Sequence, residues 1–93
     1  MVSDKKISAQ MVDELYDLLL NLKTKQDCKD LFGDLCTFKE IEQMAQRLRA
    51  AKLLMGGATY NQVIEQTDIS SATLSRVSQC VKYGTGYSKF LKK

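Results

Sequence analysis

The chain has 93 residues, of which 44% are apolar and none is proline, so it is expected to form one small, folded, all-α domain over residues 1–93 rather than a disordered segment. No apolar run is long enough to cross a bilayer, and Met1–Lys6 is too short and polar to begin a signal peptide. The net charge of +3 is uneven: residues 1–36 carry −2 and residues 37–93 carry +5, which favours a polyanionic partner for the second part, although a solvated lysine-rich surface has the same composition.

The first predicted helix carries a wide hydrophobic stripe. Ser8 can cap this helix. Its apolar residues recur at helical spacing, and they are Met11, Val12, Leu15, Leu18, Leu19 and Leu22. Tyr16 and Leu20 widen the stripe beyond the needs of one packing partner, which indicates a contact with a second subunit. The alternative is that Leu20 is simply exposed.

Two further helices are predicted before the middle of the chain. A short one is expected to stop at Gly33, with Asp34 to Cys36 as the connection. Thr37 and Glu40 then form a T-x-x-E capping box, which starts the longest helix. Its apolar residues recur every three or four positions, and they are Phe38, Ile41, Met44, Ala45, Leu48, Ala51, Leu54 and Met55.

This long helix is expected to end at Gly56-Gly57. Three basic residues lie on it: Arg47, Arg49 and Lys52. A solvated basic face is the expected role of at least two of the three.

Residues 60–81 have the pattern of a helix-turn-helix. Thr59 and Gln62 cap the first helix, Thr67-Asp68-Ile69-Ser70 forms the turn, and Ser70 or Ser71 caps a second helix that runs to about Lys82. The positions expected to be buried are Val63, Ile64, Thr67, Ile69, Leu74, Val77 and Val81. Asp68 stands where many such motifs have glycine, and aspartate tolerates the positive φ expected there. An ordinary helical hairpin in a bundle is the alternative.

The chain after the motif is expected to break and then to form one more turn of helix. Tyr83-Gly84-Thr85-Gly86 is the break, Tyr87 to Leu91 is the last turn, and Lys92 and Lys93 are expected to fray.

The second motif helix has a small, polar and cationic outer face, which suits the major groove of DNA. Near its N-terminus, five residues are expected to approach base edges: Ser70, Ser71, Ala72, Thr73 and Ser75. Four residues are better placed for phosphates: Asn61, Arg76, Gln79 and Lys82. With no histidine and no phosphate-cradling glycine loop, neither an enzyme nor catalytic residues are expected.

The three cysteines, Cys28, Cys36 and Cys80, are odd in number and lack the spacing of a metal site. They are expected to be reduced thiols of a cytoplasmic protein, two of them buried, and a redox role is not favoured. No metal is expected.

Residues 31–91 resemble the Trp repressor superfamily, and within it the Trp-repressor-related proteins of the YerC/YecD type from Gram-positive bacteria. The segments that carry the resemblance are T-F-K-E-I-E-Q-M-A-Q-R-L-R-A-A-K-L-L, Y-N-Q-V-I-E-Q-T and S-A-T-L-S-R-V-S-Q-C-V-K. The resemblance implies a six-helix, all-α subunit in an intertwined homodimer. The N-terminal helices, about residues 8–55, would interlock through Leu15, Leu18, Leu19 and Leu22. The two helix-turn-helix motifs, about residues 59–82, would meet successive major grooves roughly 34 Å apart on a palindromic operator.

The resemblance also implies a pocket for a tryptophan corepressor, whose positions fall on Thr37, Glu40, Arg47, Arg76, Val77 and Cys80. Arg47 and Arg76 match the arginines that sandwich the indole. Val77 stands where the tryptophan-binding proteins have glycine, and its side chain would project toward the indole. Cys80 replaces a serine that helps hold the ligand's amino group, a loss of about 1–3 kcal/mol. Tight tryptophan binding is therefore not expected, no cofactor is assigned, and the pocket is open to another, unidentified effector.

Two functions follow from these observations. The leading hypothesis is a dimeric, cytoplasmic transcriptional regulator that represses by binding double-stranded operator DNA. The alternative is a protein-interaction module on the same fold without sequence-specific DNA binding. Steep salt dependence of DNA binding would separate the two, because it reports phosphate contacts.

Overall fold

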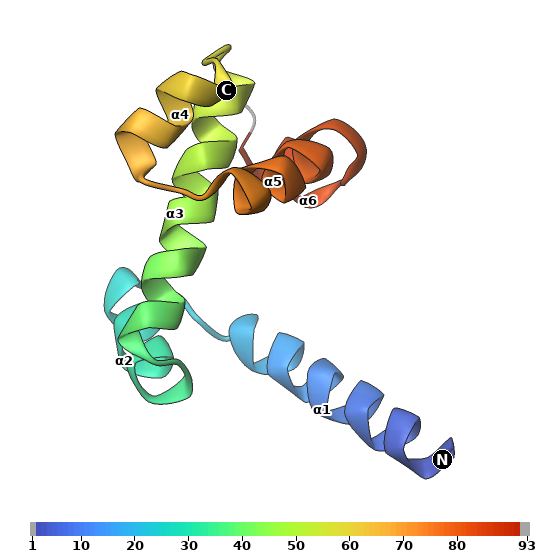
Figure 1. Ribbon diagram of the computed structural model, residues 1–93. Coiled ribbons are helices and arrows are strands. Elements are labelled where there is room, and N and C mark those ends of the chain that lie inside the picture. The colour runs from blue at the N-terminus through green and yellow to red at the C-terminus, as the bar shows by residue number, and fades with distance from the viewer. Residues whose placement is uncertain (1, 92–93) are drawn as a thin grey trace. The chain divides into compact units, whose positions relative to one another are not determined.

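The computed structural model describes the backbone of residues 2–91 and the side chains of residues 6–91, so the expected fraying of Lys92 and Lys93 lies outside the described part. Within that part all regular structure is helical, and the predicted six-helix, all-α fold is confirmed (Figure 1). The helices are α1 (Val2–Leu19), α2 (Lys25–Leu35), α3 (Phe38–Met55), α4 (Tyr60–Thr67), α5 (Ser71–Tyr83) and α6 (Gly86–Phe90). They divide into an N-terminal unit, Met1–Cys36, and a C-terminal unit, Thr37–Lys93.

The N-terminal unit departs from the predicted helix boundaries in two places. α1 begins at Val2, and Ser8 lies exposed within the helix instead of capping it. Serine disfavours a helix interior only slightly, so the better helix formers around it carry the helix through. α2 continues past Gly33 and ends at the C-cap Cys36, so Asp34 is helical. Glycine ends a helix mainly where the backbone turns to positive φ, and Gly33 keeps a negative one.

α3 starts at the predicted capping box. The Thr37 hydroxyl oxygen accepts a hydrogen bond from the Glu40 backbone N–H at 3.1 Å, and the Glu40 carboxylate accepts one from the Thr37 backbone N–H at 2.8 Å. These hydrogen bonds favour the ionised carboxylate and hold the pKa of Glu40 below its ordinary value of 4.5. α3 ends at Met55, before Gly57 with its positive φ of 96°. The predicted start and stop of this helix are confirmed.

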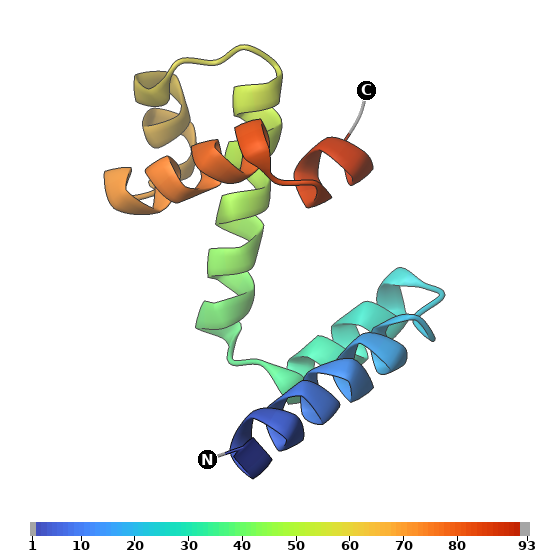
Figure 2. The same cartoon turned by 90° about the vertical axis from the view of Figure 1, so that its right-hand side faces the viewer.

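The core of the C-terminal unit lies where α4 and α5 pack against the second half of α3 (Figures 1 and 2). Two alanines of α3 are completely buried there, and their small side chains let the neighbouring helices approach closely. The buried cluster consists of Ala50, Ala51, Val63, Ile69, Leu74 and Val77. Half-buried residues surround it, and they include Tyr87 and Leu91 from the C-terminal end of the chain. One core therefore fixes both helices of the predicted motif on α3.

The three cysteines are free, and each is half-buried in the single chain, so the expected burial of two of them is not observed. Cys28 and Cys36 belong to the N-terminal unit, in which none of the described side chains is fully buried. Among the described residues, no three His, Cys, Asp or Glu side chains gather as a metal site requires. No helix in the described part of the chain is both long enough and apolar enough to cross a membrane.

Candidate nucleic-acid interface

The first helix of the motif, α4, is held at its start by a second reciprocal cap. The Thr59 hydroxyl oxygen accepts from the Gln62 backbone N–H at 3.2 Å, and the Gln62 side-chain oxygen accepts from the Thr59 backbone N–H at 2.8 Å. Val63 is fully buried and Ile64 half-buried against the core, whereas Asn61 remains exposed on the first turn. The predicted cap and the predicted buried face of this helix are confirmed.

The turn between the two motif helices has the left-handed residue expected from the sequence. Asp68 has φ 60° and ψ 22°, and its backbone N–H donates to the Ile64 carbonyl at 2.9 Å. Aspartate is one of the few residues with a side chain that adopts this conformation at modest cost. Ile69 follows it into the core with 2% of its surface exposed.

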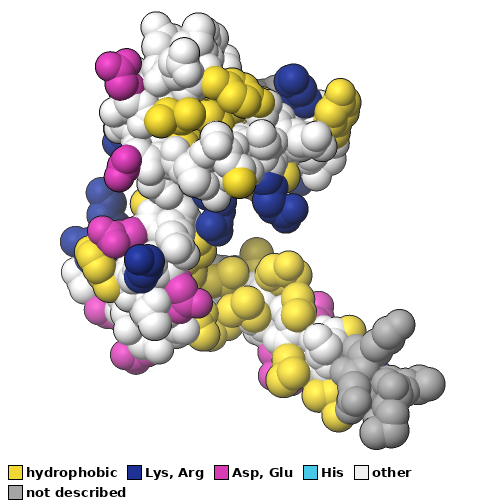
Figure 3. Space-filling view, viewed as in Figure 1, with side chains coloured by type: hydrophobic (Ala, Val, Ile, Leu, Met, Phe, Trp, Pro, Cys, Tyr) yellow, Lys and Arg dark blue, Asp and Glu magenta, His cyan; other side chains and the backbone are white. Residues whose placement is uncertain are grey.

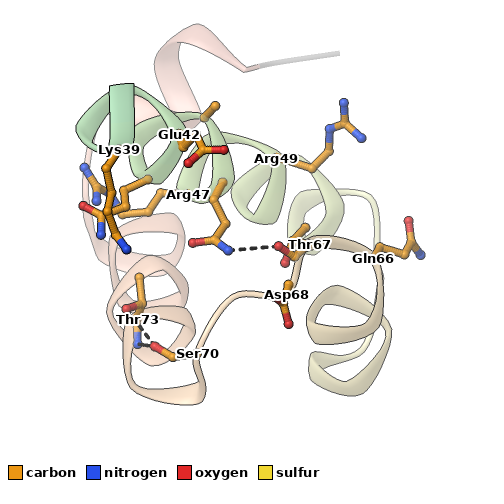
Figure 4. Close-up of a pocket in the computed structure, with 12 residues that line it drawn as sticks. Lys39, Glu42, Arg47, Arg49, Gln66, Thr67, Asp68, Ser70 and Thr73 are labelled. Atoms are coloured by element: carbon orange, nitrogen blue, oxygen red, sulfur yellow. Dashed lines mark hydrogen bonds between the residues drawn. The ribbon is translucent and has the colours of Figure 1, made fainter. Parts of the chain in front are cut away.

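A hydrogen bond from α3 supports the same turn. The Gln46 side-chain amide donates to the Thr67 carbonyl at 2.9 Å, the contact drawn as a dashed line at Thr67 in Figure 4. The Thr67 hydroxyl donates to the Val63 carbonyl at 2.7 Å. The first bond satisfies the Thr67 carbonyl at the end of α4, where no further helical turn is available to do so. The turn is therefore fixed to α3 by polar contacts as well as by the buried Ile69.

The second motif helix, α5, is capped by Ser70, one of the two predicted caps. Its side-chain oxygen accepts from the Thr73 backbone N–H at 3.2 Å, and its hydroxyl donates to the Thr73 hydroxyl at 2.9 Å. Leu74, Val77 and Ser78 are buried on the inner face of the helix. α5 ends at Tyr83, one residue beyond the predicted Lys82.

The outer face of α5, as the term is used below, consists of Ser71, Ala72, Ser75, Arg76, Gln79 and Lys82. All six side chains are exposed. Since successive helical residues turn by about 100°, the six fall within an arc of about 140°. No side chain on α5 is acidic, so the charge of this face comes from Arg76 and Lys82 alone. The structure thus brings together six of the nine residues predicted to contact DNA on one solvent-facing surface.

The other three predicted contact residues lie outside this face. Asn61 is on α4, and Ser70 precedes α5 as its cap. Thr73 is half-buried, and it lies about 160° around the axis of α5 from Ser75. Its hydroxyl already accepts a hydrogen bond from Ser70, which leaves the Thr73 hydroxyl hydrogen free to donate. Ser70 and Thr73 therefore stabilise the start of the helix in addition to any contact they make.

A polar hollow of about 910 Å³ adjoins the motif, between the first half of α3, the turn and the start of α5 (Figure 4). Lys39 and Arg47 line it from α3, while Arg49 points outward in the same view. Glu42 and Asp68 add carboxylates to the lining. Because cations and anions share the surface, its charge does not select one class of ligand.

The similarity to known proteins identifies the family. Residues 10–93 match the model of the family described as Trp repressor protein. The chain belongs to the Trp repressor family. The uncharacterized protein YerC of Bacillus subtilis (strain 168) is 42% identical over 79 residues, which cover 85% of this chain and 76% of that protein.

Two solved structures share the Trp-repressor-like fold. A crystal structure of a Trp repressor candidate from Staphylococcus aureus is 34% identical, with a TM-score of 0.82, and the match covers 94% of this chain and 87% of that one. The structure of a TrpR-like protein from Eubacterium eligens ATCC 27750 is 38% identical, with a TM-score of 0.80, over 88% of this chain and 84% of that one. The predicted membership and fold are therefore confirmed.

Four of the six residues expected to form a corepressor pocket lie together in this chain. Arg47, Arg76, Val77 and Cys80 line one cavity of about 470 Å³ between α3 and α5. Val77 also belongs to the buried core, with 1% of its surface exposed. Both arginines and the Cys80 thiol thus line one cavity, and the buried Val77 forms part of its wall.

The other two positions lie elsewhere within the C-terminal unit. Thr37 and Glu40 cap the start of α3 and bond to each other. Thr37 lies ten residues before Arg47, or about 15 Å along a helix axis. The structure of one chain therefore does not bring them to this cavity.

Tyr87 is a lining residue that the sequence did not reveal. It comes from α6, packs against the core and closes one side of the cavity that Arg47 and Arg76 line. Its place depends on how the chain folds back after the break at Gly84–Thr85, and helical periodicity carries no signal of that. The exposed Arg49 and Lys52 confirm the expectation that at least two of the three basic residues of α3 form a solvated face.

Proposed function

We propose that this member of the Trp repressor family is a sequence-specific, DNA-binding transcriptional regulator of the cytoplasm. It acts as a repressor, and its homodimer places two helix-turn-helix motifs on the two halves of a palindromic operator. The observation that carries the proposal is the outer face of α5, where small, polar and cationic side chains are exposed on a helix fixed by the core. Such a face fits a major groove about 12 Å wide.

The distribution of charge supports a polyanionic partner. Residues 37–93 contain nine basic and four acidic residues, and the C-terminal unit has the same span. Arg76 and Lys82 are exposed on α5 without an acidic neighbour on that helix. Phosphate contacts of this kind set the register of the protein on the duplex and supply affinity for any sequence.

Sequence preference then comes from the first turns of α5. Ser71 and Ser75 offer hydroxyl groups that donate to or accept from base edges, and the Ala72 methyl group fits beside a thymine methyl. Thr73 can donate its remaining hydroxyl hydrogen, while Ser70 holds the helix start. Arg76, Gln79, Lys82 and Asn61 take the flanking phosphates. With so few long side chains near the bases, part of the preference is carried by bridging water and DNA shape.

The homodimer is part of this proposal because the N-terminal unit exposes a hydrophobic face. Figure 3 shows hydrophobic side chains, in yellow, gathered along α1. The large ones that are exposed on this helix are Ile7, Met11, Val12, Tyr16 and Leu18. Leu15, Leu19 and Leu22 are only half-buried. A continuous apolar surface of this kind marks an interface, and a small domain gains stability by covering it with a second copy.

Tryptophan is not a tight ligand in this proposal. The Val77 side chain is packed in the core beside the cavity and occupies space that glycine would leave open. The Cys80 thiol is a weaker hydrogen-bonding group than a serine hydroxyl. Operator binding is therefore expected without added tryptophan.

Replacing Arg76 by alanine should weaken binding to every duplex. The variant removes one cation from the outer face of α5, so the slope of log K against log salt should fall by about one per subunit. Titrations of operator and scrambled duplexes over a range of salt concentrations measure both effects.

Arg49→Ala is the matched control, because Arg49 is an exposed arginine of α3 outside the outer face of α5. It lowers the net charge equally and should bind as the wild type does. Equal losses in the two variants would mean that net charge, not this face, attracts DNA. A wild-type protein with no salt-dependent DNA binding would favour the protein-interaction module instead.

A further inference from the structure

Tyr83, the last residue of α5, is an aromatic residue that the proposed contacts do not include. It is 81% exposed, although tyrosine usually covers part of its ring in a folded protein. At about 100° per residue, it lies between Ala72 and Arg76 around the helix axis. Tyr83 therefore belongs to the same angular sector as the outer face of α5 and extends that face to the C-terminal end of the helix.

A groove joins Tyr83 to the predicted phosphate contacts. Ser75, Arg76, Gln79 and Tyr83 line one hollow of about 530 Å³ along α5. It contains a guanidinium, an amide, a serine hydroxyl and a phenol, and its lining includes no carboxylate. All four groups donate hydrogen bonds, and one is cationic. The groove thus complements an acceptor-rich, negatively charged surface.

The chain holds Tyr83 at this position by a close approach directly after it. The Gly84 backbone N–H donates to the Cys80 carbonyl at 2.9 Å, and a Cβ atom at Gly84 would lie 2.7 Å from that carbonyl oxygen. Figure 2 shows the short connection from α5 to α6 that begins at this point. The end of α5 is therefore a defined structural position, not a fraying terminus.

The length of α5 indicates which part of the duplex Tyr83 would meet. Ser71 and Tyr83 are separated by twelve residues, about 18 Å along the axis, which exceeds the roughly 12 Å width of the major groove. With the start of α5 at the base edges, its C-terminal end reaches the sugar-phosphate backbone at the rim of the groove. A phenol is a suitable neutral donor to a phosphate oxygen there.

We propose that the Tyr83 hydroxyl donates a hydrogen bond to a backbone phosphate at the rim of the major groove. The inference rests on the proposed DNA-binding function and adds a contact residue to it. The bond fixes the angle at which α5 enters the groove, and it contributes to affinity for any sequence. Because the phenol is neutral, it releases no counterion, so its contribution does not depend steeply on salt.

Tyr83→Phe tests the hydroxyl alone, since it keeps the ring and the helix. Its binding to a duplex enriched by selection and to a scrambled duplex of the same length should weaken about five-fold per half-site, or about twenty-five-fold for a dimer on two half-sites. The salt slope should stay at the wild-type value, whereas Arg76→Ala should lower it. Phe90→Ala, which removes another largely exposed ring in the same unit, is the control and should bind like the wild type.

Three other outcomes would overturn the inference, and they can be told apart. If Tyr83→Phe kept the wild-type affinity while Arg76→Ala lost affinity, α5 would still be the DNA-binding helix, but Tyr83 would not be one of its contact residues. A loss in Tyr83→Ala but not in Tyr83→Phe would mean that the ring, not the hydroxyl, makes the contact. A wild-type chain that binds neither duplex would reject the proposed function itself, and the inference with it.

Discussion

Leu18→Glu should convert the proposed homodimer into monomer or into unfolded chain. Leu18 is 45% exposed in the single chain, and it lies on the hydrophobic face of α1 between the half-buried Leu15 and Leu22. In the proposed interface, a carboxylate at this position would be removed from water without a cationic partner, which costs several kcal/mol. Because the N-terminal unit has no fully buried side chain of its own among residues 6–36, little else would hold it.

Sedimentation at several protein concentrations measures this effect, and circular dichroism shows whether a monomer keeps its helices. Gln10→Glu is the matched control: it adds the same charge to α1 at an exposed polar position outside the leucine stripe, about 80° from Leu18 and 140° from Leu15. The control should remain dimeric. An unchanged dimer in Leu18→Glu would place the subunit interface on another surface and remove the assigned role of the leucine stripe.

Leu74→Ala should lower the free energy of unfolding by about 2–5 kcal/mol. Leu74 is completely buried and packs in the cluster that joins α3, α4 and α5. Truncation leaves a cavity that this small core has few side chains to refill. Since the total free energy of unfolding of a small domain is about 5–15 kcal/mol, this loss is a large fraction of the stability.

Urea unfolding measures this loss, and it is done at one fixed protein concentration because the stability of the proposed dimer would depend on concentration. Glu65→Ala, an exposed change on α4, should stay within about 0.5 kcal/mol of the wild type. A Leu74→Ala variant as stable as that control would contradict the assignment of Leu74 to the core and with it the inward face of α5.

Local features were predictable wherever a short segment determines its own conformation. The capping boxes at Thr37 and Thr59 need only a hydroxyl and a polar side chain three residues apart, and both form as predicted. The left-handed Asp68 was predictable because few residues with side chains tolerate positive φ. The start of α2 has the same kind of signal, a reciprocal cap between Thr24 and Asp27, which would have placed that helix correctly.

Features that depend on contacts between distant parts of the chain were harder to predict from the sequence. The sequence near Ser8 does not distinguish a helix start from a serine inside a helix, so the predicted start of α1 was wrong. The periodicity of α5 predicted its inner face but not that Thr73 would be held by the cap or that Tyr87 would close the neighbouring cavity. The expected burial of two cysteines was not observed for the same reason. The spacing of apolar residues predicts which face of a helix is apolar, whereas burial depends on which other element covers that face.

The DNA contacts and the dimer interface remain predictions, since they concern a partner rather than the conformation of one chain. The fold is consistent with most of the nine residues predicted to contact DNA. Six of them lie on the outer face of α5, on the side opposite the buried Leu74 and Val77. Because α5 has one buried face and one exposed face, substitutions on the exposed face can test the proposed function without disturbing the core.

Selection from a library of double-stranded DNA, sequenced after rounds with and without tryptophan, tests the proposed function most directly. The expected result is one palindromic motif, enriched equally in both conditions, with half-sites about one helical turn apart. A motif that appears only with tryptophan would contradict the role assigned to Val77 and Cys80. No enriched motif in either condition would contradict sequence-specific DNA binding by this chain.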